Sequence, residues 1–263
     1  NIVSKQFEKV QVGESHLENF ACAAYDSKGR IWIGGINGTV WLYEPLIQKF
    51  RVFCHHQSEL IRKIFSDDSG VWIGYDLSGL DFVGFQGNLI THYGGNPEDK
   101  YKINHNRVRD INRDEAGRIW ISTYKGITII ENGTIFNTLP QELSGLPYNS
   151  VYRIFRDSKN GIWIGTWSGG LAYRSDFDNR FFHFRKEQSD SEIEDEFVSS
   201  FAEKTDKTVL IGTEFGNLNK LDRVSSKMIN IPIKTENGKK IENIKSLLFD
   251  KETETLWIGT FLD

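Results

Sequence analysis

Histidine is the residue type used most often for proton transfer and metal binding, and the chain has 6 of them. No pair has the helical i, i+4 spacing or the Cys/His clustering typical of a zinc site. Neither Cys22 nor Cys54 lies in a recognisable nucleophile turn. We therefore predict no catalytic residue, no metal site and no cofactor.

Paired carboxylates would indicate a glycosidase, because that chemistry needs an acid and a base or nucleophile on either side of the scissile bond. Aspartates instead recur at similar places along the chain: Asp26, Asp67, Asp114, Asp157 and Asp250. Each ends a hydrophobic segment and precedes a turn, where Asp can accept hydrogen bonds from its own backbone. We expect these carboxylates to be structural, and we keep a glycosidase or lyase as the alternative.

Aromatic and basic residues are the candidates for ligand binding. Tyr75, Tyr124 and Trp167 come just after hydrophobic segments and could present their rings to a sugar. The competing interpretation is that such rings only cover the core. Three arginines that begin other hydrophobic segments would suit an acidic glycan, or would simply solvate the mouth of a channel: Arg62, Arg109 and Arg153.

These residues are placed by a repeat of roughly 45 residues, which is the length of a propeller blade. Its mark is Trp-Ile-Gly or a close variant, with Leu210 in place of Trp in one copy. Trp at a fixed place in a strand can fill the wedge between neighbouring sheets, so we predict a structural role for these anchors. The anchor tryptophans are Trp32, Trp72, Trp120, Trp163 and Trp257.

Each repeat is expected to form four antiparallel strands, because alternating apolar residues are separated by Gly-containing turns. The sequence therefore predicts an all-β propeller region over residues 1–263, with full blades near residues 17–54, 60–93, 107–138, 150–185 and 197–231. Partial units are expected at 1–12 and 244–263. They either close an imperfect six-bladed ring or belong to a larger propeller array.

The unit Asp-x-x-Gly-x-Ile-Trp-Ile-Gly-Thr-x-x-Gly-Leu is nearly complete at residues 114–127 and 157–171. It resembles the two-component regulator propeller repeat of hybrid two-component sensor histidine kinases in gut anaerobes. The first repeat departs from the pattern at Gly35, where the family usually has Thr, and the fifth at Leu210.

The resemblance implies the periplasmic sensor region of an inner-membrane protein, without enzyme activity of its own, in a full-length histidine kinase. It implies recognition of an oligosaccharide from a complex glycan and signalling to polysaccharide-utilisation genes. The implied protein partners are an adjacent propeller of the same chain and a second copy in a homodimer. A protein-interaction scaffold is the further alternative.

Composition and charge agree with such a region. The net charge of -4 excludes the global basic field expected of a nucleic-acid-binding domain. The longest apolar runs are strand-sized, so contact with a membrane is expected only through segments outside the chain. Cys22 and Cys54 are predicted on the first and fourth strands of one blade, roughly 14 Å apart. A disulfide allows about 7 Å, so two free thiols are expected.

Overall fold

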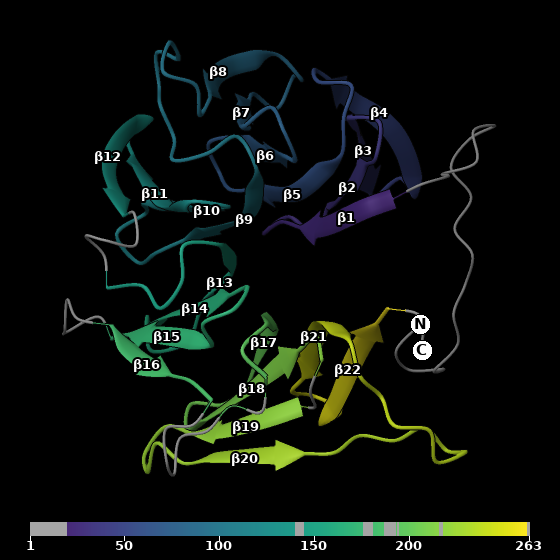
Figure 1. Ribbon diagram of the computed structural model, residues 1–263. Coiled ribbons are helices and arrows are strands. Elements are labelled where there is room, and N and C mark those ends of the chain that lie inside the picture. The colour runs from purple at the N-terminus through teal and green to yellow at the C-terminus, as the bar shows by residue number, and fades with distance from the viewer. Residues whose placement is uncertain are drawn as a thin grey trace. The chain divides into compact units, whose positions relative to one another are not determined.

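The computed structural model describes residues 20–139, 145–175, 181–186, 193, 195–215 and 218–261. Within these residues the chain consists of antiparallel β-sheets without a helix, and therefore without a helix that could span a membrane (Figure 1). The chain divides into two compact units, Asn1–Tyr93 and Gly94–Asp263.

The described part of the first unit contains two four-stranded sheets, which we call blades 1 and 2. Their strands pair in chain order, so each blade is a simple meander. Blade 1 comprises β1 (Phe20–Tyr25), β2 (Ile31–Gly35), β3 (Thr39–Glu44) and β4 (Lys49–His55). Blade 2 comprises β5 (Ile61–Ser66), β6 (Val71–Tyr75), β7 (Leu80–Val83) and β8 (Leu89–Tyr93).

The described part of the second unit contains three four-stranded blades and one two-stranded sheet, blade 6. Blade 3 comprises β9 (Val108–Arg113), β10 (Ile119–Thr123), β11 (Gly126–Glu131) and β12 (Thr134–Leu139). Blade 4 comprises β13 (Val151–Arg156), β14 (Ile162–Thr166), β15 (Leu171–Arg174) and β16 (Phe182–Phe184). Blade 5 comprises β17 (Val198–Thr205), β18 (Thr208–Thr213), β19 (Leu218–Asp222) and β20 (Met228–Ile231). Blade 6 comprises β21 (Ile244–Asp250) and β22 (Thr255–Thr260).

The predicted all-β fold of four-stranded antiparallel blades is confirmed. Residues 1–12, predicted as a partial unit, lie outside the described residues. The interpretation of residues 1–263 as one propeller region, and the closure of a ring, stay predictions. Cys22 lies on β1 and Cys54 on β4, and no disulfide joins them, as predicted. Burial, together with the negative charge of Asp81, raises the pKa of Cys54 to about 12.

The turn aspartates stabilise the hairpin between the first and second strands in blades 1, 2, 3, 4 and 6. Asp157 Oδ1 accepts the backbone N–H groups of Lys159 and Gly161, both at 2.9 Å. Its Oδ2 accepts the indole N–H of Trp163 at 2.7 Å. Asp26 with Trp32 and Asp114 with Trp120 repeat the indole bond at 3.0 and 2.9 Å. The predicted structural role is therefore confirmed, and the link to Trp is a finding that the sequence analysis lacked.

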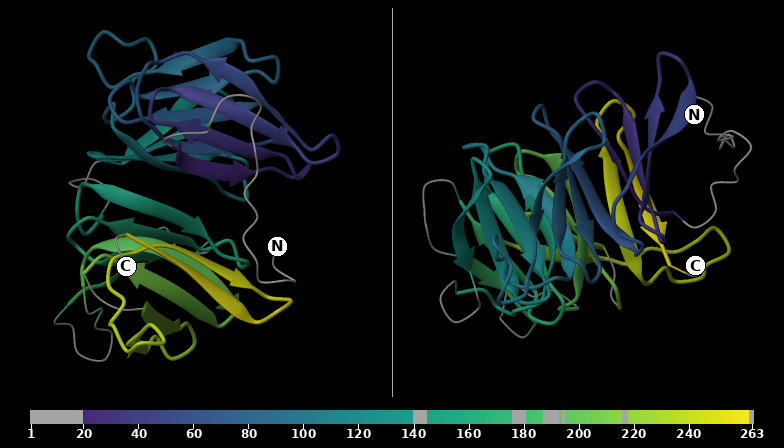
Figure 2. Two further views of the ribbon diagram at one scale, coloured as in Figure 1. Left: turned by 90° about the vertical axis from the view of Figure 1, so that its right-hand side faces the viewer. Right: turned by 90° about the horizontal axis from the view of Figure 1, so that it is seen from above.

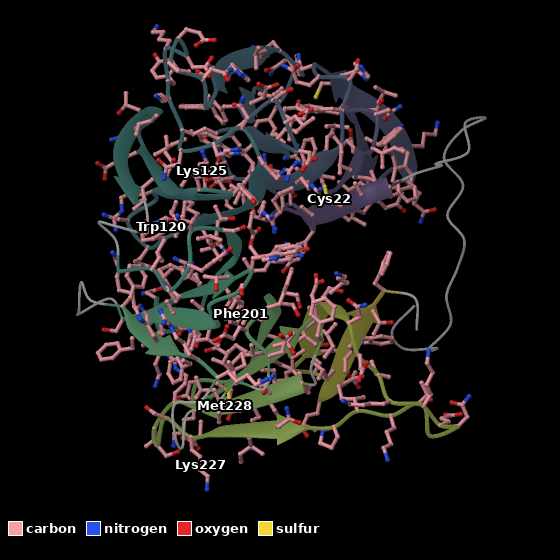
Figure 3. The ribbon with its side chains drawn as sticks, viewed as in Figure 1. Cys22, Trp120, Lys125, Phe201, Lys227 and Met228 are labelled. Atoms are coloured by element: carbon pink, nitrogen blue, oxygen red, sulfur yellow. The ribbon has the colours of Figure 1, made fainter. Side chains whose placement is uncertain are left out.

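Neighbouring blades pack face to face around these tryptophans, and Figure 2 shows the stacked sheets of the second unit from two further sides. Trp163 of β14 lies with Val198 and Phe201 of β17 in one hydrophobic cluster. Trp120 of β10 lies with Val151 and Ile154 of β13 in another. Both tryptophans are therefore fixed between two blades, as the repeat predicted. Trp120 and Phe201 are labelled in Figure 3.

Candidate functional site

A β-bulge recurs at the second residue of the first strand in the described blades. In blade 3 the register shifts between Ser122 and Thr123, opposite Arg109, and in blade 4 it shifts between Val151 and Arg153, at Tyr152. Blades 2, 5 and 6 have the same irregularity at the same place. A bulge leaves one residue outside the ladder and re-aims its side chain. Arg109 and Tyr152 therefore take equivalent positions in adjacent blades.

The residue that follows the second strand is fixed beside the bulge by a backbone hydrogen bond. The N–H of Tyr124 donates to the carbonyl of Arg107 at 3.1 Å, and the N–H of Trp167 donates to the carbonyl of Ser150 at 2.9 Å. In blade 5, the N–H of Glu214 donates to the carbonyl of Phe197 at 3.1 Å. Each of these side chains therefore starts next to the first strand of its own blade.

The bulge residues and the residues that follow the second strands of blades 3 and 4 lie close together. With Arg107 they form what we call the arginine–aromatic cluster: Arg107, Arg109, Tyr124, Tyr152 and Trp167. The Arg109 Cζ lies 5.6, 5.1 and 5.0 Å from the ring centroids of Tyr124, Tyr152 and Trp167 respectively. The Arg107 Cζ lies 5.7 Å from the Tyr124 centroid. At these separations the guanidinium groups are attracted by the π-electrons of the rings.

A further ring supports the cluster from blade 5. The buried ring of Phe197 lies 4.0 Å from Trp167 and 5.0 Å from Tyr152, centroid to centroid. Phe197 also contacts Phe215 edge-on at 6.2 Å. Trp167 is consequently held on one side, while 44% of its surface is exposed, as is 44% of Tyr124. The cluster thus combines fixed rings with accessible ring surface.

Positive charge gathers around the cluster. Arg153 places its Cζ 5.7 Å from the Tyr152 centroid and donates its Nε–H to the carbonyl of Ser199 at 2.8 Å. Lys125, labelled in Figure 3, is exposed in the turn next to Tyr124. The ring of His105 lies 5.5 Å from Tyr124. Burial, together with the charges of Lys125, Arg107 and Arg109, lowers the pKa of His105.

The structure brings together four of the six residues predicted to bind a ligand: Arg109, Tyr124, Trp167 and Arg153. The other two, Arg62 and Tyr75, belong to the first unit. Arg62 occupies the bulge of blade 2 and forms an ion pair with Asp76, Nε to Oδ1 at 2.9 Å. Asp76 holds the position that Tyr124 holds in blade 3, so the two blades differ in the partner offered to the arginine.

The prediction of an exposed Tyr75 ring is wrong. Tyr75 is 0% exposed and is the last residue of β6, opposite Ile61. Thr123 and Thr166 take this register in blades 3 and 4 and are buried as well. Successive residues of a strand point to opposite faces. The sequence analysis placed Tyr75 just after the strand, whereas it is the last residue of the strand, and this shift of one residue turned a core side chain into a predicted surface one. Burial, together with the negative charge of Asp81, raises the pKa of Tyr75.

Sequence reasoning missed Tyr152 and Phe197 as members of this region. Tyr152 directly follows Val151, just as Arg109 follows Val108, and both valines begin the first strand of a blade. Superposing the repeats on those valines would have placed Tyr152 beside Arg109. Phe197 belongs to no motif that recurs from repeat to repeat, so the sequence offered no means of finding it. Among the described residues there is no group of three or more His, Cys, Asp or Glu residues that could hold a metal ion.

Comparison with known proteins supports the repeat assignment. Residues 102–125 and 145–168 match the two-component regulator propeller family. The chain therefore carries two such repeats, as the motif predicted, and they form parts of blades 3 and 4. A comparison with curated proteins finds no match.

Solved structures confirm the fold. Two crystal structures of the extracellular domain of BT4673 from B. thetaiotaomicron each give a TM-score of 0.68 at 19% identity over 97% of this chain. BT4673 is assigned to the one-component systems in one structure and to the hybrid two-component systems in the other. The chain spans 39% and 38% of those two structures. The computationally designed protein Ika8 gives a TM-score of 0.62 at 14% identity, with 94% of this chain and 70% of Ika8 covered.

Proposed function

We propose that this chain is part of the periplasmic sensor region of a hybrid two-component histidine kinase, and that its arginine–aromatic cluster binds an oligosaccharide released from a complex glycan. The two matched repeats and the fold shared with an extracellular domain support the sensor assignment. In this proposal the propeller has no enzyme activity, and the full-length protein signals to polysaccharide-utilisation genes.

The observation that carries the binding proposal is Arg109 among three rings from two blades. A sugar ring has an apolar face of C–H groups and a rim of hydroxyl groups. Tyr and Trp offer flat surfaces that bury apolar area at low conformational cost, and an arginine has five N–H donors for hydroxyl oxygens. Because Phe197 supports Trp167 from behind, the platform is fixed before a ligand arrives.

The binding test is calorimetry of the whole chain with a panel of neutral and acidic oligosaccharides. We expect Trp167→Ala to weaken binding by about tenfold or more, since buried aromatic contacts dominate many interfaces. Phe182→Ala is the matched control, because Phe182 is also half exposed but lies on β16, outside the cluster. The absence of binding to every oligosaccharide, or equal weakening by both variants, would overturn the proposal.

The same incubations test the enzymatic alternative. A glycosidase or lyase would generate new reducing ends during incubation with a polysaccharide, whereas a sensor would leave the polymer intact. Contact with an adjacent propeller and formation of a homodimer belong to the proposed signalling mechanism of the full-length receptor. Sedimentation of the full sensor region, with and without a bound oligosaccharide, would measure the dimerisation.

A further inference from the structure

The backbone arrangement of the site recurs in blade 6. The N–H of Phe261, the first residue after β22, donates to the carbonyl of Asn243 at 3.2 Å. The equivalent bond fixes Tyr124 in blade 3 and Trp167 in blade 4. Phe261 therefore takes the position of these two rings, and 55% of its surface is exposed, compared with 44% for each of them. Three of the four described blades of the second unit thus present an exposed ring at one equivalent place.

The bulge cation of blade 3 also has a counterpart in blade 6. Lys245 occupies the β-bulge of β21, which is the position that Arg109 occupies in β9. The Lys245 Nζ lies 5.6 Å from the ring centroid of Phe261, just as the Arg109 Cζ lies 5.6 Å from that of Tyr124. At this separation the ring attracts the cation. Blade 6 therefore holds a second pair of a bulge cation and a ring, built on the same backbone as the first.

Blade 5 contributes a further ring, Phe215, which is 71% exposed. Its backbone N–H donates to the carboxylate of Asp195 at 2.9 Å, so the start of this side chain is fixed. The buried ring of Phe197 contacts both Phe215 and Trp167, with centroid distances of 6.2 and 4.0 Å. The exposed rings of blades 4 and 5 therefore rest on one buried ring.

A polar pair accompanies the ring of blade 6. The buried carboxylate of Glu214 forms an ion pair with Lys245, whose side chain is 34% exposed. The same ammonium group lies against the ring of Phe261. Lys and Glu are depleted from protein–protein interfaces, whereas N–H donors beside an exposed ring suit the hydroxyl rim and the apolar face of a sugar. This composition favours a saccharide over a protein as the occupant.

The spacing of the blades bears on the length of that saccharide. β17 contacts both β13 and β21, so blade 5 lies between blades 4 and 6. Stacked sheets pack about 10 Å apart, and equivalent places in blades 4 and 6 are separated by about two such steps. One sugar ring can therefore lie on Trp167 or on Phe261, but it cannot lie on both. A chain of linked sugars can contact the rings of all three blades.

We propose that the site continues from the arginine–aromatic cluster over Phe215 and Phe261, and that it recognises an extended oligosaccharide of at least three linked units. Successive parts of the chain lie on Trp167, Phe215 and Phe261, and a mono- or disaccharide occupies only the cluster. This inference rests on the proposed function, since it assigns the length of the ligand and adds two residues to the same site.

The test is calorimetry of the whole chain with xylo-, manno- and galacturono-oligosaccharides, each as a series from the monosaccharide to the hexasaccharide. In at least one series we expect the hexasaccharide to bind about tenfold or more tightly than the disaccharide, because each further aromatic contact adds binding energy. The affinity should stop rising once the chain is long enough to cover all three rings.

Variants connect the gain with length to blades 5 and 6. Phe215→Ala and Phe261→Ala should each weaken hexasaccharide binding by about fivefold or more and leave disaccharide binding unchanged. Trp167→Ala should weaken the binding of both ligands. Leu248→Ala is the matched control, because Leu248 is 58% exposed and also belongs to blade 6 but pairs with Trp257, away from the end of β22 that leads to the ring.

The outcomes separate this inference from the proposed function. Equal affinity for the disaccharide and the hexasaccharide in every series would overturn the extended site and leave oligosaccharide recognition intact. The same gain with length in Phe215→Ala, Phe261→Ala and the unaltered chain would do so as well. No binding by any member of any series would overturn both. Loss of self-association in sedimentation of these two variants, with hexasaccharide binding unchanged, would assign the rings to an interface between copies and would also contradict the inference.

Discussion

At the scale of single residues, the anchor tryptophans are less alike than the repeat suggests. Trp32, Trp120 and Trp163 each donate the indole N–H to an aspartate six residues earlier. Asp67 and Asp250 are displaced by one residue relative to their tryptophans. The Nε1 atoms of Trp72 and Trp257 are buried without a hydrogen-bond partner among the described residues.

The strand register explains this difference. Phe65 pairs with Trp72, Phe155 with Trp163, and Leu248 with Trp257. The turn aspartate comes two residues after the strand residue paired with the tryptophan in each of these blades, so its place on the first strand is constant. The turn itself is one residue shorter in blade 2 and one residue longer in blade 6. The change of length leaves the indole without its acceptor.

We predict that Trp163→Phe destabilises the protein more than Trp72→Phe. Both changes remove similar buried area, but only the first removes a hydrogen bond to a buried carboxylate. The difference should be about 1.5–3 kcal/mol in the free energy of unfolding, which is the range for hydrogen bonds to charged groups. Urea denaturation followed by circular dichroism measures it. Equal losses would show that the indole bond contributes no net stability.

At the scale of elements, the third residue of Trp-Ile-Gly sets how closely blades approach. A Cβ at Gly165 would lie 2.7 Å from Cγ1 of Val198, which begins β17 of the next blade. The same place in blade 1, Gly34, faces Ile61 of blade 2 at 2.7 Å. Glycine is therefore required there by packing between blades, and not by an unusual backbone conformation.

We predict that Gly165→Ala lowers the free energy of unfolding by about 1–3 kcal/mol, as overpacking of a core commonly does. Ser122 is the matched position in blade 3, where a side chain is already present and completely buried. Ser122→Ala should cost less, because the Cβ remains and only a long hydrogen bond of 3.3 Å is lost. Thermal denaturation of both variants tests this; a neutral Gly165→Ala would show that the blades can separate without cost.

Within each of the two units, a blade contacts the next blade along the chain, and the last described sheet of the second unit has the fewest strand partners. β18 pairs with both β17 and β19, whereas β22 pairs only with β21 among the described residues. All six residues of β22 are half-buried, while most of β18 is buried.

We predict that the backbone amides of β22 exchange with solvent about tenfold faster or more than those of β18, because fewer neighbours must separate to expose them. Hydrogen–deuterium exchange with mass spectrometry on the unaltered chain resolves the two strands. Equal protection would indicate that β22 pairs with another segment of the chain or with a second copy.

The sequence by itself determined the blades, because a pattern of Asp, Gly, Trp and alternating apolar residues specifies each hairpin locally. It also predicted that Cys22 and Cys54 form no disulfide, and it picked out three of the five residues in the arginine–aromatic cluster, Arg109, Tyr124 and Trp167, since the starts and ends of strands carry local signals. Only the tertiary structure decided that Tyr75 is buried and that Tyr152 and Phe197 join Arg109. Successive residues of a strand face opposite sides, so a strand end misplaced by one residue reverses the facing of Tyr75, and contacts between blades join residues that no local pattern connects.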